Sequence, residues 1–211
     1  MLCDLSPTPK ALFETGLPAS SDTRQLSLPQ PPIRQVTNGE SGKYGDGDPS
    51  WSPDGASLAF GAGGNETAGE ESIHVVDLKT NHISALPGSE GMWSPRWSPD
   101  GRFIAGLSGS AVDKLMLYDL RTREQSQLVN LPSGCPTWSR DGDFLFFLSE
   151  SAGPGWVSRI WMRDRKVERV TNRGNIRVAG WGWFATAPDN SPITARDAGT
   201  DEIYALEWEA P

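Results

Sequence analysis

Short apolar runs bounded by polar turns recur along this chain at a nearly constant interval. The three clearest runs, residues 56–60, 102–107 and 143–148, each follow a Trp-Ser-Pro-Asp-Gly stretch or, in the third case, Trp-Ser-Arg-Asp-Gly. The Asp residues of these stretches are 46 and then 41 residues apart. A period in this range is typical of a repeat architecture, in which each unit is one small supersecondary element.

Aligning the turns exposes two further sets of matched segments in each unit. One set ends in an acidic residue and comprises residues 73–77, 115–119, 160–164 and 203–207. The other is polar and alternating and comprises residues 33–37, 83–86, 125–129 and 167–171. Each unit therefore holds four short strands, named A to D here, with the turn between A and B. Four strands per repeat of this length predict the blade of a β-propeller.

The predicted fold is all-β, a propeller of about four four-stranded antiparallel blades. Residues 1–30 are rich in Pro and Ser without periodicity and read as a flexible leader before a propeller region at 31–211. In the last blade, Pro188-Asp189-Asn190 replaces the turn, and Asn tolerates the positive φ otherwise taken by Gly. Strand 33–37 can supply the missing strand D of that blade, so the units form either a closed ring or an open arc. The blades are predicted at residues 48–87, 93–130, 135–172 and 178–209.

Charge narrows the range of partners. The net charge is −8, and an acidic chain lacks the basic footprint of non-specific nucleic-acid binding, so no nucleic-acid partner is predicted. One exception runs from Arg159 to Arg177, where seven basic residues outnumber two acidic ones. This stretch is either a solvated strand edge, which Lys and Arg protect from aggregation, or a binding patch. No run is long enough to span a membrane, and residues 1–20 do not resemble an export signal.

Candidate binding residues lie at the ends of the strands opposite the repeated turns. The connections B–C and D–A, which form the predicted loop face, are long and divergent, and variable loops on a rigid scaffold usually carry binding. A protein partner or a small ligand is therefore expected on this face. The candidate residues are Asp46, Asp48, Trp93, Arg96, Trp156 and Trp181.

Each candidate has a structural alternative. Trp93, Trp156 and Trp181 fall outside the repeat phase, so they either stack on a ligand or fill space near the propeller axis. Asp46 and Asp48 could offer oxygen ligands to Ca²⁺, but the remaining ligands of a known loop are missing, which favours a turn. No metal, cofactor or catalytic residue is predicted, since the two histidines have no partner at a ligand spacing.

The repeated Trp-Ser-Pro-Asp-Gly turn, its apolar strand, the strand ending in Asp and the Arg-Gln-Val-Thr type of strand together resemble the repeat of TolB-like propellers. The likeness covers residues 33–209, and the end of the chain also resembles large bacterial signalling proteins that carry such a propeller. The resemblance implies a non-catalytic scaffold for protein or ligand binding, as the sensor or interaction part of a larger protein. The alternative is an accessory propeller that gates substrate for a hydrolase or peptidase domain. The resemblance also implies an extracytoplasmic location, although the chain shows no signal peptide.

Overall fold

A computed structural model of the protein describes residues 35–37, 46–62, 71–108, 114–149, 155–172 and 184–194. Within these ranges the chain forms only β-strands and turns, and no helix there could cross a membrane. The strands are β1 (Asp46–Trp51), β2 (Ser57–Ala62), β3 (Ser72–Asp77), β4 (Ile83–Ala85), β5 (Met92–Trp97), β6 (Phe103–Ser108), β7 (Leu115–Asp119), β8 (Glu124–Val129), β9 (Ser133–Trp138), β10 (Phe144–Ser149), β11 (Trp156–Trp161), β12 (Val167–Asn172), β13 (Phe184–Thr186) and β14 (Pro192–Thr194).

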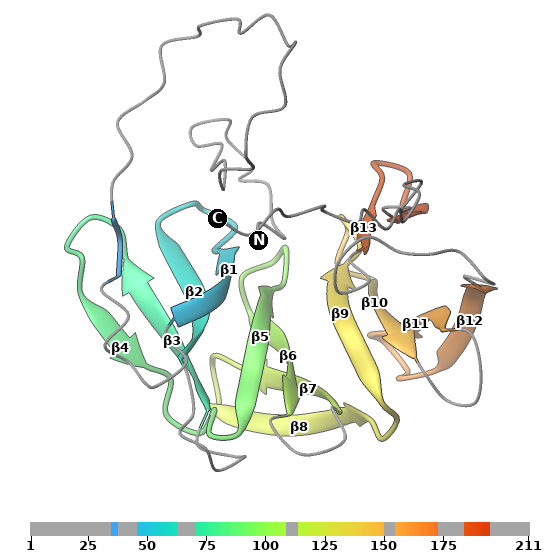
Figure 1. The fold of residues 1–211 in the computed structure, drawn as a ribbon, viewed down its shortest axis with the longest axis horizontal. Helices are drawn as coiled ribbons and strands as arrows, with labels where there is room; N and C mark the ends of the chain where they lie inside the picture. The colour runs from blue at the N-terminus through green and yellow to red at the C-terminus, as the bar shows by residue number, and fades with distance from the viewer. Residues whose placement is uncertain are drawn as a thin grey trace, which may run out of the picture.

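Consecutive strands pair in antiparallel fashion into blades. There are three four-stranded sheets, β1–β4, β5–β8 and β9–β12, followed by a two-stranded sheet of β13 and β14. In Figure 1 the three full sheets follow one another around a common centre, with β4, β8 and β12 at the periphery. The first strands are neighbours, because β1 contacts β5, β5 contacts β9, and β9 contacts β13. The predicted all-β partial propeller of about four blades is confirmed, and the described blades form an open arc.

The same hydrogen bonds build every A–B turn of the full blades. In the second blade the Ser98 hydroxyl donates to Asp100 over 2.5 Å and accepts the Phe103 N–H over 2.8 Å. Gly101 takes a φ of +74°, and its N–H donates to the Ser98 carbonyl. The turns of the first and third blades repeat these bonds. The recurring Asp is therefore a turn residue, as the repeat predicts.

Neighbouring turns also pack on one another. The Pro53 ring lies 3.8 Å from the position that a Cβ on Gly101 would occupy, and the same contact recurs between the second and third blades. The third turn has Arg140 in place of Pro, and its N–H donates to the Asn190 side chain over 3.1 Å. Asn190 takes a φ of +63°, which confirms that it replaces Gly in the fourth turn. The fourth unit is thus joined to the third by an N–H that proline lacks.

Each innermost strand carries a β-bulge just before its tryptophan. The strand register shifts at this point in β1, β5 and β9. The bulged residues are Asp48, Ser94 and Cys135, with φ of +53°, +53° and +48°, and each precedes a proline. A non-glycine residue rarely takes this conformation, so its threefold recurrence marks a built feature of the repeat.

The segment predicted to end at Asp164 is wrong by three residues. Asp119 pairs with Phe103 in the second blade, and Trp161 pairs with Phe144 at the equivalent position of the third. Trp161 therefore stands where the first two blades have Asp. Asp164 lies within the following turn, where its carboxylate accepts the N–H of Lys166, two residues further on, as a recurring turn Asp would.

Side chains of alternate residues on the middle strands form cores between the blades. The core between the first and second blades contains Ala59, Ile73, Met92, Ile104 and Tyr118. The core between the second and third contains Ala105, Leu107, Leu115, Leu117, Val129, Trp138, Leu145, Phe147 and Ile160. Burying one large apolar side chain stabilises the fold by about 1.5–3 kcal/mol, so these cores fix the blades relative to each other. Trp138, which recurs in phase with the repeated turn, is 9% exposed and belongs to this second core.

The prediction that strand 33–37 completes the last blade falls partly outside the described residues. Residues 35–37 have no strand pairing. Val36 packs against a cluster on the face of the first blade that is turned away from the second blade, here called the outward side. That cluster contains Leu58, Phe60, Ala62 and Val76. The strand C predicted at 203–207 and the leader at 1–30 lie wholly outside the described ranges.

Candidate binding surface

Two of the predicted site residues meet beside the bulges of the first two innermost strands. Asp48 is the bulged residue of β1, and Arg96 lies two residues after the equivalent bulge of β5. The Arg96 guanidinium donates to the Asp48 carboxylate over 2.9 Å. The Ser94 hydroxyl, from the bulge of β5, donates to the other oxygen of the same carboxylate. The repeated bulge therefore brings together three polar groups from two blades.

Arg96 is the most buried charged residue of this cluster. Its side chain is 9% exposed, whereas that of Asp48 is 28% exposed. The guanidinium also donates to the Pro95 carbonyl over 2.7 Å, and the Arg96 carbonyl accepts the indole N–H of Trp138 over 2.9 Å. One residue thus links the first, second and third blades. A buried guanidinium needs such partners, because desolvation without them costs several kcal/mol.

The other predicted residues lie apart from this cluster. The Trp93 indole N–H donates to the Ser108 carbonyl over 3.2 Å, and its ring packs against the core between the second and third blades. Trp156 begins β11, a third strand, with the Arg169 guanidinium 5.0 Å above its ring. Trp181 lies outside the described residues.

Asp46 begins β1, and its negative charge influences the pKa of a histidine in the same blade. Burial lowers the pKa of His74 below its usual value, and the negative charge of Asp46 opposes that shift. The His74 ring meets Phe60 edge to face, with centroids 5.8 Å apart. Within the described ranges no group of three His, Cys, Asp or Glu residues is placed to hold a metal ion.

Among the D–A connections, residues 87–93 are described in full. The Tyr118 hydroxyl donates to the Pro87 carbonyl over 2.7 Å, and the Gln125 side chain donates to the Glu90 carbonyl over 3.0 Å. Both donors belong to the outer strands of the second blade. This D–A connection is therefore held against the next blade by two side-chain bonds.

Ser94 and an arginine–aromatic cluster on the third blade were missed at the sequence level. Ser94 could have been found, because Asp48-Pro49, Ser94-Pro95 and Cys135-Pro136 recur three residues before each tryptophan. The cluster surrounds Trp161, with the Arg163 guanidinium 4.2 Å above its ring. The sequence did not reveal this cluster, because Asp164 was matched to the recurring Asp in place of Trp161.

The chain matches the family model of the TolB beta propeller domain over residues 48–193 and belongs to that family. A comparison with curated protein sequences gives no match. Solved structures of similar fold include the following three. TolB from Acinetobacter baumannii is 21% identical with a TM-score of 0.60, covering 74% of this chain and 39% of that one. The beta-propeller domain of the Trilobed protease from Pyrococcus furiosus, of open velcro topology, is 21% identical with a TM-score of 0.51, covering 61% and 43%. Hydrazine synthase from Kuenenia stuttgartiensis is 20% identical with a TM-score of 0.51, covering 69% and 42%.

At these identities the three structures establish the fold alone. The chain spans about two fifths of the length of each.

Proposed function

We propose that this propeller is a non-catalytic scaffold that binds a protein partner or a small ligand where its innermost strands begin. The observation that carries the proposal is the cluster of Asp48, Ser94 and Arg96. It fixes the first strands of two blades while leaving the Asp48 carboxylate 28% exposed. Beside it Gly47 is exposed, and a Cβ added there would have no atom within 4 Å. A rigid framework with an accessible edge suits recognition.

The proposal extends to the context of the domain. We infer that it serves as the sensor or interaction part of a larger bacterial signalling protein and that it acts outside the cytoplasm. The acidic chain and the turn role of the repeated Asp residues support a binding scaffold over an enzyme. The described residues place no acid–base pair in the cluster beyond the Asp48–Arg96 ion pair.

Photocrosslinking tests the position of the binding site. A photoreactive amino acid placed at Gly47 is expected to capture a partner from the native host. The same group placed at Lys79 serves as the matched control, because Lys79 is exposed in the C–D turn of the same blade. Capture from Lys79 alone, or from neither position, contradicts the proposal.

A second candidate is an accessory propeller that gates or orients substrate for an enzyme domain. The likeness to the propeller domain of a protease favours this alternative. The two functions differ in what the Gly47 crosslink contains. A hydrolase or peptidase domain supports the accessory role, whereas a kinase, a DNA-binding domain or another regulatory protein supports the signalling role.

A further inference from the structure

The outermost strands of the three full blades differ in what they expose. Strand β4 has only three residues, and the exposed positions of β8 are Glu, Gln and Ser. Strand β12 instead leaves Val167 and Val170 exposed by 42% and 38%. In β8 the equivalent of Val170 is Leu128, which also occupies a bulge but packs against the core between two blades. The third blade therefore exposes apolar side chains on an edge strand, and its neighbour does not.

Basic residues lie close to these valines in the sequence. Residues 155–172 carry five basic and two acidic residues in a chain of net charge −8. The Arg163 and Lys166 side chains are 71% and 68% exposed, although each also has a carboxylate 3.6–3.7 Å away. The Arg159 guanidinium is shared between the Glu168 carboxylate at 3.0 Å and the Phe144 ring at 4.4 Å. The region of residues 155–172 is thus locally positive, although the protein as a whole is acidic.

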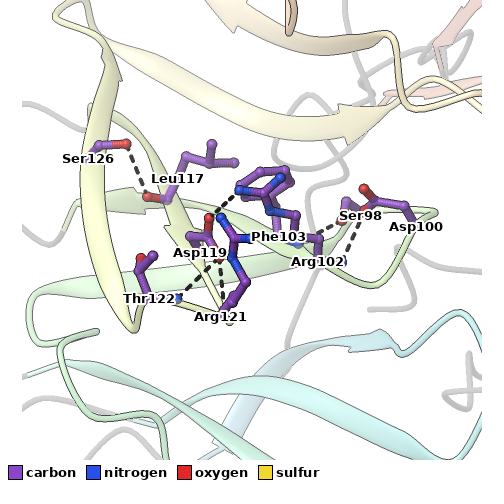
Figure 2. A network of polar contacts seen from close by, with 9 residues as sticks. All are labelled: Ser98, Asp100, Arg102, Phe103, Leu117, Asp119, Arg121, Thr122 and Ser126. Carbon is purple, nitrogen blue, oxygen red and sulfur yellow. Dashed lines mark hydrogen bonds and ion pairs between the residues drawn. The ribbon is translucent and has the colours of Figure 1, made fainter.

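The aromatic residues of this region depart from the repeat. Figure 2 shows the second blade, where the Asp119 carboxylate accepts the backbone N–H groups of Arg121 and Thr122 and pairs with Arg102. The third blade replaces that carboxylate with Trp161, which contacts Phe144 with ring centroids 3.9 Å apart. The third blade therefore lacks a carboxylate at this position and has a half-buried indole beside a guanidinium. Trp and Arg are the side chains most enriched at the centre of protein interfaces.

We propose that the edge of β12 is a docking strand for an extended acidic segment of a partner protein. Trp161 with Arg163 marks one end of the strand, and Trp156 with Arg169 marks the other. Strand β12 is the edge of its sheet within the described residues, so alternate backbone groups are open to a fifth strand. Main-chain pairing supplies affinity in such complexes, and alternate side chains supply specificity. This surface is separate from the one beside Asp48 and does not depend on it.

The positive charge selects the class of partner. Carboxylates spaced along an extended chain can pair with Arg163, Lys166 and Arg169, while small apolar residues between them contact the two valines. A nucleic acid would gain the same few contacts but would be repelled by the remaining surface of an acidic chain. An acidic peptide strand fits both the charge and the shape of this edge.

Fluorescence anisotropy with the full chain tests the proposal. The probe is a labelled nine-residue peptide in which Glu alternates with Val, measured at low and at physiological salt. Arg163→Glu is expected to weaken binding by about tenfold, the scale of one charge-assisted contact. Arg121→Glu is the matched control, because Arg121 is the exposed equivalent in the second blade, and it is expected to leave binding within about twofold. Circular dichroism confirms that both variants remain folded.

Control probes separate strand addition from simple charge attraction. A peptide with Pro at its centre cannot donate the central ladder bond and is expected to bind about tenfold more weakly. Equal losses in the two arginine variants, or equal binding of the Pro peptide, would overturn the proposal. So would tighter binding of a nine-nucleotide single-stranded DNA. Self-association of the chain that Arg163→Glu abolishes would likewise overturn it, in favour of a second copy as the occupant.

Discussion

At the scale of single residues, the Asp48–Arg96 pair is the clearest link between sequence and structure. Both residues were selected from the sequence, but their contact was not predicted, because they are 48 residues apart and belong to different repeats. Their meeting depends on the bulge that gives Asp48 a positive φ and on the stacking of adjacent blades. Sequence periodicity locates each residue within its own unit but does not determine how neighbouring units are placed.

Neutralising Asp48 tests how much this pair stabilises the fold. Asp48→Asn keeps a residue type that tolerates positive φ, yet it leaves the Arg96 guanidinium, 9% exposed, without a counter-charge. The free energy of unfolding is expected to fall by about 1–3 kcal/mol. In an Arg96→Met background the same change is expected to cost less than about 0.5 kcal/mol. Urea unfolding followed by tryptophan fluorescence measures both, and equal costs in the two backgrounds would refute the coupling.

At the scale of the element, the A–B turn was fully predictable because all its determinants are local. Ser, Asp and Gly act within six residues, and Asn190 replaces Gly at the expected position. The third C–D turn was not predictable from the same pattern. There Trp161 replaced the recurring Asp, and Asp164 imitated it three residues later. Local turn chemistry can occur at more than one position, and only the strand pairing showed which position belongs to the repeat.

The turn carboxylates predict a loss of stability in acid. Hydrogen bonds from the Ser52, Ser139 and Ser191 hydroxyls lower the pKa of Asp54, Asp141 and Asp189 below the ordinary value of 3.8. Because the folded state depresses these pKa values, their contribution is complete above the unfolded pKa. It is lost as the pH falls through 3.8 and then through the lower folded values. The melting temperature is therefore expected to decrease as the pH falls below about 4.5.

Ser139→Ala isolates one turn of this set. It removes the donor to Asp141 and the acceptor of the Phe144 N–H, so the melting temperature at pH 7 should fall. The further drop between pH 5 and pH 3 should be smaller than in the unaltered protein, because the pKa of Asp141 is no longer held down by that bond. Ser126→Ala is the control, since its hydroxyl donates to the Leu117 carbonyl at the long distance of 3.5 Å. An unchanged acid slope in Ser139→Ala would contradict the assignment.

At the scale of the whole molecule, the number and order of the blades followed from the repeat, but the closure of the ring did not. Closure depends on whether the segment predicted at residues 33–37 pairs with the last blade or packs against the first. Its alternating pattern suits either a strand or a packed connection. The structure brings Val36 to the outward cluster of the first blade, without strand pairing. That cluster is buried, with Phe60 and Val76 at 2% and 0% exposure. The apolar cluster on the outward side of the first blade is therefore buried, and Val36 contributes to its burial.

A charge placed at Val36 distinguishes this packing from circular closure. Val36→Asp puts a carboxylate against an apolar cluster, which should lower the local stability of the first blade by about 1–3 kcal/mol. Amide hydrogen exchange is then expected to speed up in β2 and β3 and to stay unchanged in β10 and β11. Gln35→Asp is the matched control, because Gln35 is exposed and adjacent. If exchange instead rises in β13 and β14, the segment completes the last blade, and the arc closes into a ring in solution.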